Sequence, residues 1–241
     1  MEQLVEVLVK IVFFAFIVGM FTLVIREFVR SSQSDKRIRR GWAELEHVAA
    51  ERAWTYEKRA PGRATEYCGV GPMPGSGSNL TAWHYITGEF RGRSFKCFEY
   101  RYSNPLSGSS GVGESRKLTF ETVMLITAPG PGPFMQIGRP GKFDRMLGRG
   151  PRKLLGIPEF DKKFRLDTRD EAFARNVLDS GLMTFLLSDR RALKSPIRVR
   201  EDELFTWYTG TLSPQTLDDG LNHLSDALDH IPAQAWTAAR Q

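Results

Sequence analysis

The spacing of hydrophobic residues changes along the chain, and its first pattern is an almost unbroken apolar run over residues 4–25. Glu6 and Lys10 are the two charged residues inside it. As a helix rising about 1.5 Å per residue, the run would be roughly 33 Å long, which is enough to cross a hydrocarbon core. The pattern therefore predicts a transmembrane helix, with residues 1–30 as the anchor.

The flanks of the apolar run disfavour two other interpretations. A cleavable signal peptide has a basic start and a small-residue cleavage site, whereas this run follows Glu2 and ends at Arg26. A soluble helix that is apolar on all sides needs a large protein to bury it. Six basic residues follow the run and predict a single-pass inner-membrane protein with its N-terminus outside and its C-terminal domain in the cytoplasm. These residues are Arg26, Arg30, Lys36, Arg37, Arg39 and Arg40.

Beyond a basic juxtamembrane linker over residues 31–40, the spacing becomes that of a folded domain. An amphipathic helix is predicted first, because apolar residues recur every three or four positions at Ile38, Trp42, Leu45 and Ala49. Three segments rich in aromatic and β-branched residues follow, at 80–90, 94–102 and 117–128. Gly92 lies between the first two segments, where a hairpin turn favours glycine. An antiparallel β-meander is the simplest interpretation.

The last third of the chain combines helical spacing with capping signals. Thr168 followed by Glu171 predicts a capping box that opens a helix, and Ser213-Pro214 predicts the start of the final helix. The leucine stripe of that final helix lasts under three heptads, which favours packing on the sheet over a coiled coil. Residues 197–209 are expected to form a hairpin with its turn at Glu201–Glu203, and "APGPGPF" is expected to be a loop after the sheet.

These elements define the expected fold class. It is α+β, with an N-terminal transmembrane helix followed by one cytoplasmic domain over residues 41–241, in which an antiparallel β-meander precedes packed helices in the C-terminal third. A hydrophobic content of 41% in 241 residues is enough for a packed core.

The net charge of +6 comes from two short basic segments, residues 26–40 and 139–153. Beside a bilayer such segments contact anionic lipid headgroups, although an ordinary solvated loop is the alternative for the second one. Nucleic acid is disfavoured because no recognised binding motif accompanies the charge. The candidate lipid contacts are Arg37, Arg39, Arg40, Lys142, Arg145, Arg149, Arg152 and Lys153.

Motifs for catalysis are absent from the sequence. It has no Walker loop, GxSxG elbow, HExxH or CxxC, so no catalytic residue, cofactor or metal is assigned. The two cysteines fit a reducing compartment. Glu99 and Asp161 are each a candidate acid or base with His84. For Glu99 a cross-strand ion pair with an arginine is favoured, whereas for Asp161 a cap or an ion pair is an equal alternative. His223 and His230 share a helix face near Asp219 and Asp226, where a solvated polar face is favoured over a metal site.

Several segments together resemble a group of actinobacterial membrane-anchored proteins of unknown function. They are the apolar anchor, the Gly41-Trp42 pair, "GEFRGRSFKCFEYRY", "FDKKFRLDTRDEAFARNVLDSGLMTFLL" and the final leucine-periodic helix. The resemblance implies location and fold kinship, and no catalytic residue. The resulting hypothesis is a non-catalytic binding or scaffold domain held near the lipid bilayer for an unknown protein partner. The alternative is a membrane-tethered enzyme whose Glu99 or Asp161 meets His84 in a pocket.

Overall fold

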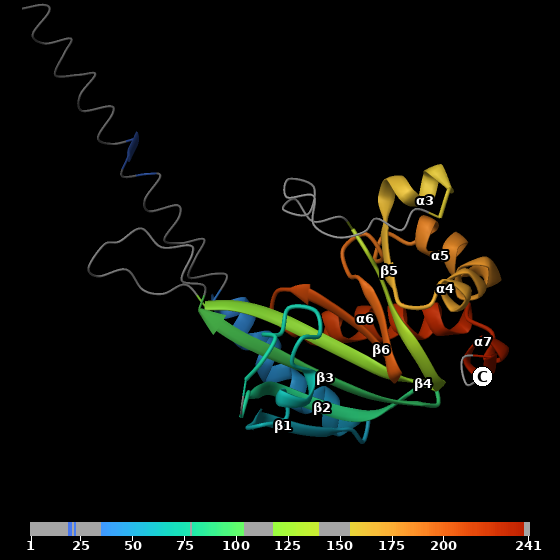
Figure 1. Cartoon of the computed structure of the whole chain (residues 1–241). Helices are drawn as coiled ribbons and strands as arrows, with labels where there is room; N and C mark the ends of the chain where they lie inside the picture. Colours follow the sequence, from blue (N-terminus) through green and yellow to red (C-terminus); the bar gives the residue numbers. More distant parts are fainter. Residues whose placement is uncertain are drawn as a thin grey trace, which may run out of the picture. The chain divides into compact units, whose positions relative to one another are not determined.

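A computed structural model of the chain describes Gly19, Met20, Thr22 and residues 35–77, 79–103, 118–139 and 155–238 (Figure 1). The chain divides into two compact units, Met1–Ala43 and Glu44–Gln241. A helix over residues 35–51 begins in the first unit and ends in the second. In its second-unit part Leu45 and Ala49 are buried, in agreement with the predicted apolar stripe.

The predicted fold class needs one correction, which concerns the membrane. Within the described ranges, no helix is long and apolar enough to cross a bilayer. This finding contradicts the predicted transmembrane helix and, with it, the single-pass topology and the inner-membrane location. Of residues 4–25 the structure describes Gly19, Met20 and Thr22, and the remainder lies outside the described residues.

The second unit contains a six-stranded antiparallel sheet whose order is β1-β2-β3-β4-β5, with β6 paired to β4. The predicted meander is present as β2, β3 and β4, and β1 extends it at one edge. β6 runs along one edge of the long β4, while β3 and β5 share the other edge. The strands are β1 (Thr55–Ala60), β2 (Ala82–Phe90), β3 (Arg93–Ser103), β4 (Leu118–Gly138), β5 (Arg165–Thr168) and β6 (Ile197–Thr209).

The turn between β2 and β3 is the predicted hairpin. Phe90 pairs with Arg93, and the two residues between them, Arg91 and Gly92, have φ values of 52° and 74°. Two successive positive φ values match the right-handed twist of the flanking strands, and glycine adopts them without steric cost.

The expected loop after the sheet and the expected hairpin at Glu201–Glu203 are both wrong. "APGPGPF" lies inside β4, and Glu201 lies inside β6, where it pairs with Gly132 between two register shifts. Prolines cannot donate to a ladder and are tolerated at bulges. The residues typical of turns in β4 and β6 therefore lie opposite each other, at the irregular pairing of Gly132 with Glu201. Both strands continue through this point, and neither reverses direction.

The labelled helical segments lie between strands or after β6, and α6 is the longest of these segments. The helical segments are η1 (Thr65–Tyr67), α3 (Pro158–Lys163), α4 (Glu171–Val177), η3 (Leu178–Leu182), α5 (Met183–Ser188), α6 (Pro214–Asp229) and α7 (Ala233–Ala238). Ser213 caps α6 as predicted, through a reciprocal box with Thr216. At α4 the predicted cap is wrong, because the Asp170 carboxylate accepts the Phe173 N–H while Thr168 ends β5.

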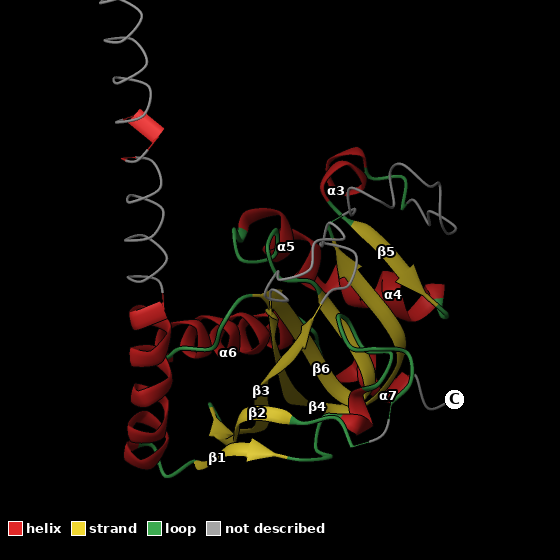
Figure 2. Ribbon diagram, turned by 90° about the vertical axis from the view of Figure 1, so that its left-hand side faces the viewer, coloured by secondary structure: helices red, strands yellow, loops and turns green. Residues whose placement is uncertain are grey.

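The two faces of the sheet are covered differently. On one face, residues of the 61–80 segment pack into a cluster with aromatic residues of the strands, including Tyr67 against Phe98 and Phe205. On the other face, α6 contacts β4 and β6, and its leucine stripe is buried (Figure 2). The prediction that this helix packs on the sheet is therefore confirmed.

Gly88 of β2 provides space for an aromatic side chain. Any side chain at this position would collide with the ring of Trp54, whose Nε1 donates to the Glu89 carbonyl at 3.0 Å. We expect Gly88→Ala to lower the free energy of unfolding by about 1–3 kcal/mol, since the indole must move. Urea denaturation followed by tryptophan fluorescence measures this loss. The control Gly75→Ala, at a position with open space, should change stability by less than about 1 kcal/mol, and equal losses in both variants would contradict the steric explanation.

Candidate functional site

His84, one of the candidate catalytic residues, is buried in a polar cluster on β1, β2 and β3. Its Nδ1 lies 2.8 Å from the hydroxyl of Tyr56, and its side chain is almost completely buried. Its backbone is left-handed, with φ of 50°, at a bulge in the pairing of β2 with β3. Burial lowers the pKa of His84, and together with the nearby charges of Arg101 and Lys58 it brings the pKa to about 4. The imidazole is therefore neutral near pH 7.

Glu99 lies in the same cluster and is fully buried. The Arg101 Nε is 3.8 Å from its carboxylate, and Arg101 stacks on the rings of Trp83 at 4.3 Å and Phe120 at 5.5 Å. A cross-strand arginine was predicted, whereas this ion pair is formed by an arginine two residues later on the same strand, β3. The structure thus places His84 and Glu99 in one buried cluster near Arg101, whose charge acts on both.

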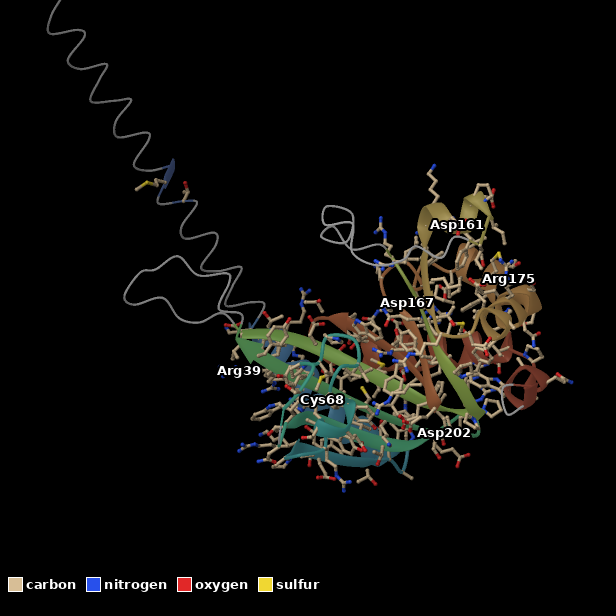
Figure 3. All side chains as sticks on the ribbon, in the orientation of Figure 1. Arg39, Cys68, Asp161, Asp167, Arg175 and Asp202 are labelled. Carbon is tan, nitrogen blue, oxygen red and sulfur yellow. The ribbon has the colours of Figure 1, made fainter. Side chains whose placement is uncertain are left out.

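Asp161, the other candidate acid, has a local structural role. Its carboxylate accepts the backbone N–H groups of Leu155, Gly156 and Ile157 at 3.0–3.1 Å, which closes the turn before α3. Figure 3 places Asp161 on α3, far from the β1 edge of the sheet. The structure does not bring it to His84, so the predicted pairing of these two residues is wrong.

His223 of α6 and His230, the residue after its end, both stack on Phe185, as expected for residues on one side of the helix. His223 is buried, so the expected solvated face is wrong for it. The Nδ1 of His223 lies 3.0 Å from the carboxylate of Asp189, which also accepts from Arg191. Burial lowers the pKa of His223 despite this acidic neighbour. Across the residues that the structure describes, no group of three or more acidic, cysteine or histidine side chains could hold a metal ion.

The basic residues predicted to contact lipid divide into two groups. Arg37, Arg39 and Arg40 are exposed on the helix over residues 35–51. The other five, Lys142, Arg145, Arg149, Arg152 and Lys153, lie outside the described residues. The lipid contact of both groups stays a prediction.

A basic surface that the sequence search missed lies where β5, β4 and β6 run side by side. Gln136 of β4 pairs with Asp167 of β5 and with Arg198 of β6, so these three residues form one row across the strands. Alternate residues on the same strands are buried on the other face. We call the outward positions the arginine face, and they are Phe134, Gln136, Gly138, Arg165, Asp167, Arg169, Pro196, Arg198 and Arg200.

Phe134 lies beneath two arginines of the arginine face. The guanidinium carbon of Arg198 lies 4.8 Å from its ring centroid, and that of Arg169 lies 5.8 Å from the same centroid. Arg198 also donates to the Gly69 carbonyl, and Arg200 donates to the Glu66 carbonyl, so the 61–80 segment borders the face. Burial lowers the pKa of Arg198. The charges of Arg200 and Arg169 lower the same pKa further, whereas the charge of Asp167 raises it.

The sequence does contain a pattern typical of this surface, because charged and buried residues alternate along two of its strands. Arg165 and Asp167 of β5, and Arg169 directly after it, alternate with apolar or buried residues, as Arg198 and Arg200 do on β6. The two groups are about thirty residues apart in the sequence, and their meeting depends on both strands pairing with β4. This pairing was not predicted, because residues 197–209 were expected to form a hairpin of their own.

Comparison with known proteins gives a likeness of fold. No protein family and no curated protein matches the chain. A solved structure does: the crystal structure of the mycobacterial trehalose monomycolate transport factor A, TtfA, superposes with a TM-score of 0.51. The two are 16% identical, and the match covers 81% of this chain and 95% of that one. At this identity the likeness establishes a shared fold.

Proposed function

We propose that this protein is a non-catalytic binding module that takes part in lipid transport. The observation that carries the proposal is the fold likeness to a transport factor for trehalose monomycolate over 95% of that chain. The contact of its basic residues with anionic lipid headgroups, and the binding of a partner protein, belong to the same proposal.

The chemistry of the buried groups supports a non-catalytic role. A general acid or base must reach a proton on a substrate. His84 and Glu99 are instead enclosed beside Tyr56 and Arg101, and Asp161 is held by three backbone amides. These residues stabilise the fold in our interpretation, and the enzyme alternative receives no support from their geometry.

Depletion of the protein in its own host tests the transport role. With lipids labelled by radioactive acetate, we expect one lipid class to shift from the surface-extractable fraction to the cell-retained fraction. The wild-type gene should restore the distribution, and Glu99→Gln at the same protein level should restore it equally. An unchanged lipid distribution after depletion would overturn the transport role, whereas failure of Glu99→Gln alone would favour an enzyme.

A further inference from the structure

The arginine face has an excess of positive charge. Its outward positions include four arginines and one acidic residue, Asp167. Glu201 lies 3.7 Å from Arg200 and offsets part of the charge at one margin, while Arg169 is exposed. Cations held close together by a rigid sheet repel one another, so an anion placed among them is stabilised.

The opposite face of β4, β5 and β6 is buried by other parts of the same domain. Met135, Leu166 and Val199 are buried there, and Phe173 of α4 and Trp236 of α7 pack together on the Gly132 and Val199 region of that side. The arginine face is bordered by the 61–80 segment and, among the described elements, carries none of these helices. It is therefore the side of β4, β5 and β6 on which a partner can lie.

The hydrogen-bonding groups of the face are those that bind phosphate. Guanidinium groups present a planar fork that matches phosphate oxygens, and Arg169 and Arg198 both lie over the Phe134 ring. Within the described part of the chain, the buried Nε–H of Arg198 has no hydrogen-bond partner. Because that nitrogen is enclosed, the phosphate contact of Arg198 is assigned to its terminal guanidinium nitrogens, of which Nη1 also donates to the Gly69 carbonyl.

The same geometry disfavours nucleic acid. Single-stranded nucleic acid binds through aromatic side chains on which its bases stack. The Phe134 ring is already covered by two guanidinium groups and cannot offer that platform. Three adjacent strands are about 10 Å across, which suits one phosphate group better than a polyanionic chain.

We propose that the arginine face binds the phosphate of an anionic phospholipid headgroup at a bilayer surface, with Arg169 and Arg198 as its main contacts. This inference rests on the proposed lipid-related function and adds to it the site and the chemistry of the lipid.

A fluorophore at position 167 tests the proposal in the full chain. Asp167 is exposed on β5, within the arginine face, so Asp167→Cys in a Cys68→Ser background can be labelled with bimane while Cys97 stays buried. The label should be quenched by nitroxide headgroups in phosphatidylglycerol vesicles and much less in phosphatidylcholine vesicles. A label at Arg175→Cys, exposed on α4, should stay unquenched in both (Figure 3).

Substitutions then identify the contacts. Arg169→Gln and Arg198→Gln should each weaken quenching about fivefold, and the double variant should abolish it, whereas Arg190→Gln at another exposed site should have no effect. Arg198→Lys keeps the charge without the planar fork and should give an intermediate loss, with circular dichroism confirming folding of every variant.

Four results would overturn the proposal. They are equal quenching at positions 167 and 175, equal quenching by both lipids, full quenching in the folded double variant, and loss of quenching when millimolar inorganic phosphate or an oligonucleotide is added. The lipid-depletion phenotype is measured separately and can persist when this site fails, so the two proposals fail independently.

Discussion

Replacing Arg101 by methionine is expected to lower the free energy of unfolding by about 3–5 kcal/mol. Glu99 is fully buried, and the Arg101 guanidinium supplies a positive charge 3.8 Å from its carboxylate. Methionine fills a similar volume but leaves the carboxylate in the core without that charge. Stacking on Trp83 is lost as well, which adds a smaller cost. Urea denaturation at pH 7 measures the change.

Two further variants separate the charge effect from packing. Arg59 also lies over the Trp83 ring, at 5.4 Å, but is exposed, so Arg59→Met should cost less than about 1 kcal/mol. The double variant Glu99→Gln with Arg101→Met removes both charges and should be more stable than Arg101→Met alone. If the double variant were as unstable as the sum of its two single variants, Glu99 and Arg101 would not be coupled.

Much of the sheet could be predicted because its residues alternate or contain a clear turn. β2 and β3 are joined by two residues with positive φ, one of them Gly92, and this signal is local in sequence. The Ser213-Pro214 signal is local too, and it placed the start of α6 correctly. Thr168 shows the limit of such motifs, since Asp170, two residues later, competes for the same role and caps the helix.

The errors arose where long-range pairing overrides local signals. Proline and glycine in β4, and the acidic residues of β6, are typical of turns when each segment is considered alone. Paired through Gly132 and Glu201, they form a bend in two continuous strands. The arginine face depends on the same pairing, which is why its residues could not be assembled from the sequence. His84 and Glu99 were identified as polar residues on strands, but their burial and the ion pair of Glu99 with Arg101 depend on the fold.

Acid should destabilise the protein through His84 by roughly 3 kcal/mol between pH 6.5 and pH 4. Burial and the cations Arg101 and Lys58 lower the pKa of His84 from 6.5 to about 4 in the folded state. Below pH 6.5 the unfolded chain takes up a proton at this imidazole while the folded chain does not, so stability falls as the pH falls toward 4. Above pH 6.5 neither state is protonated, and the contribution vanishes.

Comparison with His84→Asn isolates this contribution, because carboxylates also titrate in the same range. Asparagine tolerates the positive φ at position 84 and does not titrate. Urea unfolding of both proteins at several values between pH 7.5 and 4 should give profiles that are parallel above pH 6.5 and converge below it, as the wild type loses stability faster. Profiles that stay parallel down to pH 4 would mean that His84 keeps an ordinary pKa. Convergence would instead establish that the polar cluster holds His84 neutral, as expected for a group that stabilises the fold and exchanges no proton with a substrate.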